Sequence, residues 1–184
     1  MTKQVYFAPA ASGKTEYTLN LAQQAAVSGQ EVRICLPTGL QAQAGRRKLA
    51  TAGGAFGVHV FTFDRLVAAC LNAAREAYTE LSEPVQYRLL RAVIDRLPLQ
   101  HYASLKNKPG FLQVSQHLIT ELKSALVTPM DFSAAVIQLE DTPRLRELAD
   151  IYSAYQDQMR DQGWADRVGL HWLAVEALRL SLIH

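Results

Sequence analysis

The sequence of 184 residues contains only two cysteines, Cys35 and Cys70. One falls in an expected strand and the other in an expected helix, so neither a disulfide framework nor a cysteine-based zinc site is indicated, and core packing is favoured for both. The five histidines are scattered without the spacing of metal ligands. The sequence also has no internal repeat and no low-complexity segment.

Long apolar runs are missing as well. No segment approaches the roughly 20 consecutive apolar residues that a membrane-spanning helix needs, and the start of the chain lacks the apolar region of a secretory signal peptide. Hydrophobic residues make up 49% of the sequence and charged residues 20%, which is ordinary for a soluble globular protein. We therefore expect a cytoplasmic protein with no membrane partner.

The most informative feature that is present is a loop of small residues after an apolar run, Val5-Tyr6-Phe7. A strand followed by such a loop turns successive backbone N–H groups inward, and the next helix points its positive end at the same place, which suits phosphate. The loop ends in Gly-Lys-Thr and has the pattern of a P-loop. The expected ATP-binding residues are Ala8, Pro9, Ala10, Ala11, Ser12, Gly13, Lys14 and Thr15.

Two side chains of this loop are expected to be catalytic. Lys14 would reach the β- and γ-phosphates, and the Thr15 hydroxyl would be a ligand of Mg²⁺. The first position of the pattern is Ala8 in place of the usual glycine, and its small methyl group is tolerated when φ is negative. The sequence therefore predicts ATP and Mg²⁺ as cofactors.

The two halves of the chain predict different secondary structure. Residues 4–8, 31–36 and 58–63 are β-rich and alternate with helical patterns, which predicts βαβ units and a parallel sheet. Downstream only helices are predicted, several of them opened by a cap residue and a proline. The expected fold class is α/β, with a P-loop unit over residues 1–80 and an all-helical unit over residues 81–184.

An acidic residue that could hold Mg²⁺ is found at only one place. A P-loop enzyme takes this residue from an apolar strand that ends in Asp or Glu, and residues 60–64, which end in Asp64, resemble such a strand. Asp64 could then serve a small-molecule kinase. The alternative places Asp64 near the N-terminus of a helix, where a carboxylate is favoured.

Positive charge gathers at Arg46-Arg47-Lys48, although the net charge of the chain is only +2. Such a cluster can contact a polyanion such as a nucleic acid. It can also be the solvated face of a helix. Charge alone leaves both interpretations open.

Three segments together resemble superfamily 1 DNA helicases, namely residues 8–15, 36–49 and 60–66. More narrowly, the chain resembles the N-terminal region of the AddB/RexB-type subunit of bacterial ATP-dependent helicase-nucleases, in which these segments are helicase motifs I, Ia and Ib. The resemblance implies a P-loop NTPase (RecA-like) parallel-sheet unit, part of helicase domain 1A, followed by an all-helical inserted subdomain similar to 1B. Further segments that fit the insertion are Glu121-Leu122-Lys123 and Gly163-Trp164-Ala165-Asp166.

The resemblance also implies a function in DNA recombination and double-strand-break repair. The expected partners are DNA, single-stranded or as a duplex end, and an AddA/RecB-like helicase-nuclease subunit. Motifs Ia and Ib touch the backbone of single-stranded DNA, which nominates Thr38, Arg46, Thr62 and Phe63 as DNA contacts. Phe63 could stack on a base if it is exposed, and the alternative is a buried strand end.

We further expect from the resemblance that this chain is an N-terminal fragment. The Mg²⁺-binding acidic motif, the second motor domain and any nuclease site would then lie beyond residue 184. On this interpretation the 184 residues bind ATP without turning it over.

Overall fold

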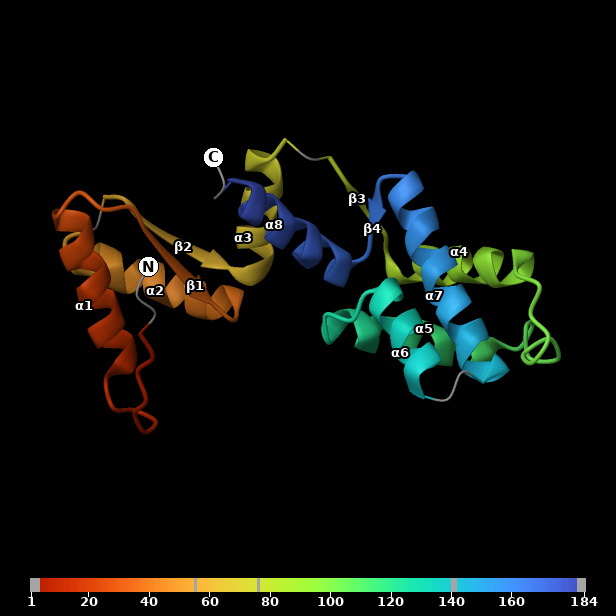
Figure 1. Cartoon of the computed structure of the whole chain (residues 1–184). Helices are drawn as coiled ribbons and strands as arrows, with labels where there is room; N and C mark the ends of the chain where they lie inside the picture. Colours follow the sequence, from red (N-terminus) through yellow and green to blue (C-terminus); the bar gives the residue numbers. More distant parts are fainter. Residues whose placement is uncertain (1–3, 55, 76, 140–141, 182–184) are drawn as a thin grey trace. The chain divides into compact units, whose positions relative to one another are not determined.

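The computed structural model of this chain divides into two compact units, one ending at Ala69 and the other beginning at Cys70. Helices dominate the described residues, and the strands form two separate two-stranded sheets (Figure 1). No described helix combines the length and the apolar character needed to cross a membrane. The structure describes residues 4–54, 56–75, 77–139 and 142–181.

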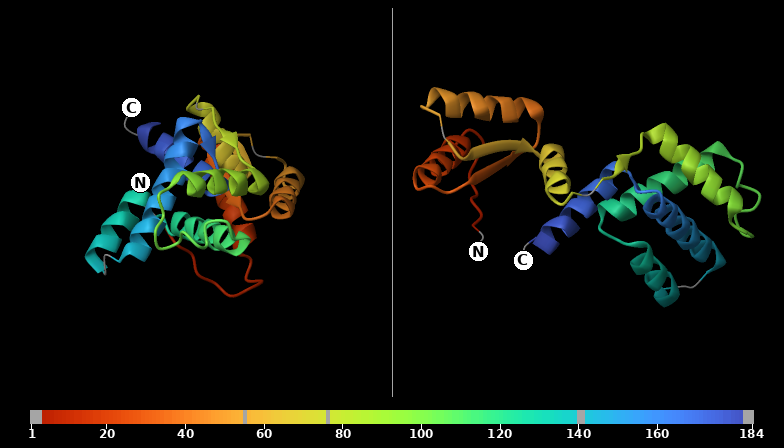
Figure 2. Two further views of the ribbon diagram at one scale, coloured as in Figure 1. Left: turned by 90° about the vertical axis from the view of Figure 1, so that its right-hand side faces the viewer. Right: turned by 90° about the horizontal axis from the view of Figure 1, so that it is seen from above.

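The first unit is built on a parallel pair of strands. Ile34 lies opposite Val60 in this pair, in the register that also joins Leu36 to Thr62. Both flanking helices pack against the strands (Figure 2), and their contacts enclose a small apolar core. The elements are α1 (Lys14–Val27), β1 (Val32–Leu36), α2 (Gly39–Thr51), β2 (Val58–Thr62) and α3 (Phe63–Ala73), the last of which crosses the unit boundary.

A glycine sets how closely α2 approaches the sheet. A methyl group built on Gly45 would lie 3.2 Å from Cδ1 of Leu36 and 3.8 Å from Cγ1 of Val60. Gly45 itself is buried, and so are Ala42 and Leu49 on the same helix face. The spacing of these three residues along α2 therefore makes a flat face that fits against the strands.

The expected α/β fold with a RecA-like parallel sheet is wrong for the described residues. The strands expected at residues 31–36 and 58–63 are present and parallel, but residues 4–8 form no strand and pair with neither. Phe7 is 92% exposed, and the Tyr6 ring instead meets the Tyr17 ring of α1 edge-on at a centroid distance of 5.4 Å. An apolar run becomes a strand only where a neighbouring strand takes its hydrogen bonds.

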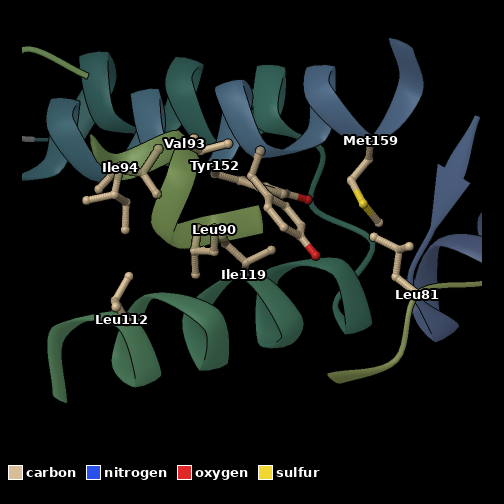
Figure 3. Close-up of a cluster of buried hydrophobic side chains, with 10 residues drawn as sticks. Leu81, Leu90, Val93, Ile94, Leu112, Ile119, Tyr152 and Met159 are labelled. Atoms are coloured by element: carbon tan, nitrogen blue, oxygen red, sulfur yellow. The ribbon is translucent and has the colours of Figure 1, made fainter. Parts of the chain in front are cut away.

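The second unit is a helical bundle with one further strand pair. Its core gathers side chains from α4, α5 and α7, with Tyr152 and Met159 among the most deeply buried (Figure 3). Leu90 and Ile94 are also fully buried, because they lie one helical turn apart on the same face of α4. The elements are β3 (Thr79–Glu80), α4 (Glu83–Arg96), α5 (Pro109–Ser124), α6 (Pro129–Leu139), α7 (Pro143–Asp161), β4 (Trp164–Ala165) and α8 (Arg167–Ser181).

Three of these helices begin as the cap-and-proline pattern predicts, since α4 has a proline in its first turn and α6 and α7 start at prolines. The helix α5 also starts at a proline, Pro109, which the sequence pattern placed in the preceding loop. At α6 the cap is reciprocal: the Asp131 N–H donates to the Thr128 hydroxyl at 3.1 Å, and the Thr128 N–H donates to Asp131 Oδ2 at 3.1 Å. The Thr128 hydroxyl also donates to Asp131 Oδ2 at 2.6 Å, and this bond together with the one from the Thr128 N–H lowers the pKa of the Asp131 carboxyl. Thr142 precedes α7 in the cap position, but its side chain makes no capping bond.

The expectation that this half contains only helices is also wrong in one place. β3 and β4 pair in parallel, with Thr79 opposite Trp164. The Thr79 N–H donates to the Gly163 carbonyl at 3.0 Å and the Leu81 N–H to the Ala165 carbonyl at 2.9 Å. Strands of two residues carry no periodicity, so only the tertiary pairing defines them.

Candidate phosphate-binding and nucleic-acid site

The loop that precedes α1 takes its shape from a glycine. Gly13 lies immediately before the helix with φ at +82°, in the left-handed region that glycine enters without steric cost. Ala11 also has a positive φ of 58°. All residues from Ala8 to Thr15 are exposed to solvent. The loop therefore turns sharply and leads directly into the helix N-terminus.

The Lys14 side chain folds back over the loop that precedes it. Its ammonium group donates hydrogen bonds to the carbonyl oxygens of Ala8 and Pro9, the latter at 2.7 Å. Thr15 follows in the first turn of α1, and Thr18 Oγ1 donates to the Lys14 carbonyl at 2.8 Å. A positive charge and the positive end of a helix thus lie at the same loop.

A cavity of about 340 Å³ opens beside these residues. Its volume lies in the range of about 300–1,000 Å³ typical of ligand pockets. Lys14 and Lys48 both line it, and the described lining residues include no Asp or Glu, so the cavity suits an anion. The lining consists of Lys14, Thr15, Thr18, Leu19, Ile34, Leu36, Pro37, Gln41, Ala44, Gly45 and Lys48.

The sequence does not predict that residues of α2 line this cavity. Gln41, Ala44, Gly45 and Lys48 line it from α2. Their spacing of three, one and three residues puts them on one helix face. That periodicity indicates one shared helix face, although only the fold shows that this face meets the loop before α1.

The four residues nominated for DNA contact come from adjoining parts of the first unit. Thr62 ends β2, and Thr38 follows β1 by two residues, so both lie at the carboxyl edge of the parallel pair. Phe63 opens α3 and is 55% exposed, which removes the alternative of a buried strand end. Thr38 and Thr62 are engaged, because they accept hydrogen bonds from the backbone N–H groups of Gln41 (3.2 Å) and Arg65 (3.4 Å).

The three residues of the basic cluster on α2, Arg46, Arg47 and Lys48, make different contacts. The Arg46 guanidinium donates to the Val60 carbonyl at 3.1 Å, which ties α2 to β2. Arg47 and Lys48 are exposed, and Lys48 lines the cavity. Arg46 therefore has a structural contact as well as a charge, whereas Arg47 presents its charge to solvent.

Asp64 lies in the first turn of α3. This is the position that the second interpretation of the sequence gave it, where a carboxylate interacts favourably with the helix end. Among the residues that the structure describes, no group of three or more His, Cys, Asp or Glu side chains could hold a metal ion.

These features define a helix-rich protein with a P-loop-like segment facing an anion-compatible cavity. The chain matches the protein family described as "ADDB, N-terminal" over residues 5–183, and it belongs to that family. The resemblance seen in the sequence is thereby confirmed. AddB belongs to AddAB-type helicase-nucleases of recombination and DNA repair. No curated protein matches the chain.

Proposed function

We propose that this chain is the nucleotide-binding part of an AddB-type subunit, which binds ATP with Mg²⁺ at residues 8–15 and DNA on the first unit. The observation that supports it most directly is the cavity of about 340 Å³ with Lys14 and Thr15 in its wall. The family supplies the context of recombination and repair. The partners would be DNA and an AddA/RecB-like subunit.

Different residues of the loop would contact different parts of the bound nucleotide. The Lys14 ammonium would exchange its carbonyl partners for phosphate oxygens, and the N–H groups of the first turn of α1 would donate to the same phosphates. The Thr15 hydroxyl would hold the metal ion, which neutralises phosphate charge when it is bound. Lys48 would add a second positive charge from the opposite wall.

The magnesium role of Thr15 can be tested separately from nucleotide binding itself. ATP affinity of the full chain is measured with Mg²⁺ and with EDTA, for the wild type and for Thr15→Ala. We expect Mg²⁺ to strengthen binding in the wild type and to have much less effect in the variant. The substitution Thr18→Ala, one turn later on the same cavity wall, serves as the matched control and should keep the Mg²⁺ effect.

DNA binding is proposed for the edge formed by the exposed Thr38 and Phe63 with the half-buried Thr62, and for the adjacent basic cluster. Arginine neutralises backbone phosphates, and an exposed aromatic ring can stack on a base for about 1–3 kcal/mol. The half-exposed Phe63 ring is available for this contact. The proposal therefore combines a sequence-tolerant stacking surface with charge that is sensitive to salt.

Fluorescence anisotropy with a labelled oligothymidine tests the DNA proposal. We expect Phe63→Ala and Arg47→Ala each to weaken binding by about tenfold at low salt, which is about 1.4 kcal/mol. Arg47→Ala should also reduce the slope of log affinity against log salt by about one. The control is Arg33→Ala, since the exposed Arg33 pairs with Glu31 at 3.2 Å. Equal binding by all variants would refute the proposed surface.

The isolated chain should bind ATP without hydrolysing it or transferring phosphate. The alternative function, a small-molecule kinase, predicts the opposite result. These 184 residues would then transfer phosphate by themselves, and Asp64→Asn would abolish that activity. Nucleotide turnover assays of both proteins therefore separate the two functions. Turnover that depends on Asp64 would favour the kinase.

A further inference from the structure

A second cavity lies in the helical unit, between the segment that follows α4 and the N-terminal half of α5. Its volume is about 340 Å³. Side chains of Tyr102, Leu105, Phe111, Val114 and Leu118 give it an almost wholly apolar lining, and Leu148 of α7 adds to it. We call it the α5 pocket. None of its residues contributes to the phosphate-binding loop or to the proposed DNA surface.

The walls of the α5 pocket are fixed by hydrogen bonds. The Glu147 carboxylate accepts three consecutive backbone N–H groups, from Gln100 and His101 at 2.7 Å and from Tyr102 at 2.9 Å. The Tyr102 ring then packs against the Phe111 ring with centroids 4.9 Å apart. A preorganised wall loses little conformational entropy on binding a ligand.

One buried polar group in the lining has no partner. The Oγ of Ser115 is buried and makes no hydrogen bond with any described residue, and Ser115 as a whole is 2% exposed. An unpaired buried hydroxyl costs free energy. A polar atom of a ligand in the pocket would satisfy this group, so the observation points to an occupant.

The rim of the pocket is positively charged. Lys108 lines it, is exposed, and makes no side-chain hydrogen bond or ion pair with a described residue. Lys108 is also the residue before α5, whose N-terminus has no side-chain cap and begins with Pro109 and Gly110. The helix end and the ammonium both favour a carboxylate beside the apolar pocket.

The apolar lining discriminates between classes of partner. A nucleobase carries several donors and acceptors on its edge, and burying them without partners is costly. The α5 pocket offers little beyond one serine hydroxyl for them. An aromatic or aliphatic amino-acid side chain buries the same area without that cost, and an adjacent Asp or Glu would meet Lys108.

We propose that the α5 pocket binds an acidic peptide segment of a protein partner by enclosing one of its apolar side chains. Val114 is 68% exposed at the opening and contacts the entering side chain. Ser115 pairs with a polar atom of the segment, and Lys108 pairs with its carboxylate. The site gives this chain a protein-docking function separate from nucleotide and DNA binding.

The test is a selection of random displayed peptides on the full chain, followed by titration of a labelled enriched peptide. We expect enriched peptides to combine Asp or Glu with an aromatic or leucine residue. Val114→Glu should weaken their binding by about tenfold or more. The matched control is Ile137→Glu on α6, because Ile137 is also 68% exposed, and it should leave the affinity unchanged.

A second variant keeps the proposal testable even if Val114→Glu fails to fold. Lys108→Glu changes an exposed rim residue and should weaken acidic peptides by about tenfold, with a weaker salt dependence than in the wild type. The proposal is overturned if no peptide is enriched, if enriched peptides are basic, or if Val114→Glu and Ile137→Glu bind equally. It is also overturned if oligothymidine, and not peptide, loses affinity in Val114→Glu.

Discussion

The ammonium nitrogen of Lys123 lies 2.6 Å from Oδ2 and 2.8 Å from Oδ1 of Asp166, and both residues are buried. Asp166 Oδ1 also accepts the Gly169 N–H at 2.7 Å, and the Trp172 indole donates to the Lys123 carbonyl at 3.1 Å. Burial lowers the pKa of Lys123, and the charge of Asp166 opposes that shift. This ion pair joins α5 to the start of α8.

Removing one partner of this pair should be far more harmful than removing both. Asp166→Ala leaves a buried ammonium without its counter-charge, and we expect a loss of about 3–5 kcal/mol in the free energy of unfolding. The double variant Lys123→Met with Asp166→Ala should recover much of that loss. Denaturant unfolding followed by circular dichroism measures both. Asp150→Ala, at an exposed position on α7, is the control.

The Glu147 carboxylate should give the helical unit an acid-dependent stability. Burial raises the pKa of the Glu147 carboxyl. The hydrogen bonds from the N–H groups of His101, Tyr102 and Gln100 together lower this pKa by more than burial raises it, so the net shift is downward. A lowered pKa means that the stabilisation is complete above the ordinary glutamate pKa of about 4.3. It is lost as the pH falls through the lowered value.

The substitution Glu147→Gln tests this statement. The variant should be less stable than the wild type at neutral pH by about 1 kcal/mol, because charge-assisted hydrogen bonds are replaced by weaker ones. The difference should shrink as the wild-type carboxylate becomes protonated at acid pH. Urea unfolding at several pH values measures it, and a difference that stays constant across the acid range would contradict the assignment.

The glycine before α1 should matter for binding as well as for stability. Gly13→Ala places a methyl group at a φ of +82°, which costs about 1–2 kcal/mol for an L-residue. Gly29→Ala, just beyond the other end of α1, has a φ of +77° and imposes a similar strain. Both variants should lose stability in thermal unfolding. Only Gly13→Ala should also weaken nucleotide binding, and equal nucleotide affinity of the two variants would contradict this role.

Tyr152 combines complete burial with a hydrogen bond across the core. Its hydroxyl donates to the Val127 carbonyl at 2.9 Å, and burial raises its pKa. Tyr152→Phe leaves that carbonyl unpaired and should cost about 1–2 kcal/mol. At the exposed Tyr6, whose hydroxyl bonds Gln4, the same substitution should cost less than about 0.5 kcal/mol. Equal costs in chemical denaturation would show that the core bond adds no stability.

The sequence predicted those elements whose signals are local. Prolines and cap residues located the starts of α4, α6 and α7, and β-rich runs located β1 and β2. The failure at Val5-Tyr6-Phe7 has a physical cause, since strand propensity needs a hydrogen-bonding neighbour, and Tyr6 packs on α1 in the structure. The strand pair of Thr79 with Trp164 has no local signal at all.

The candidate site was predictable to a similar extent. The loop pattern identified Lys14 and Thr15, which line the cavity. The pattern could not show that Lys48 of α2 also lines the cavity, or that the Arg46 guanidinium donates a hydrogen bond to the Val60 carbonyl. Those facts depend on how α2 packs against the sheet, and Gly45 sets that distance.

The proposed binding of ATP by the loop at residues 8–15 depends on Lys14. The most direct measurement is isothermal titration of ATP with Mg²⁺ into the full chain, for the wild type, Lys14→Ala and the control Lys108→Ala. We predict saturable binding with one site for the wild type and for Lys108→Ala, and an affinity lower by about a hundredfold or more for Lys14→Ala. Equal affinity of Lys14→Ala and the wild type, or no binding by the wild type, would contradict the account.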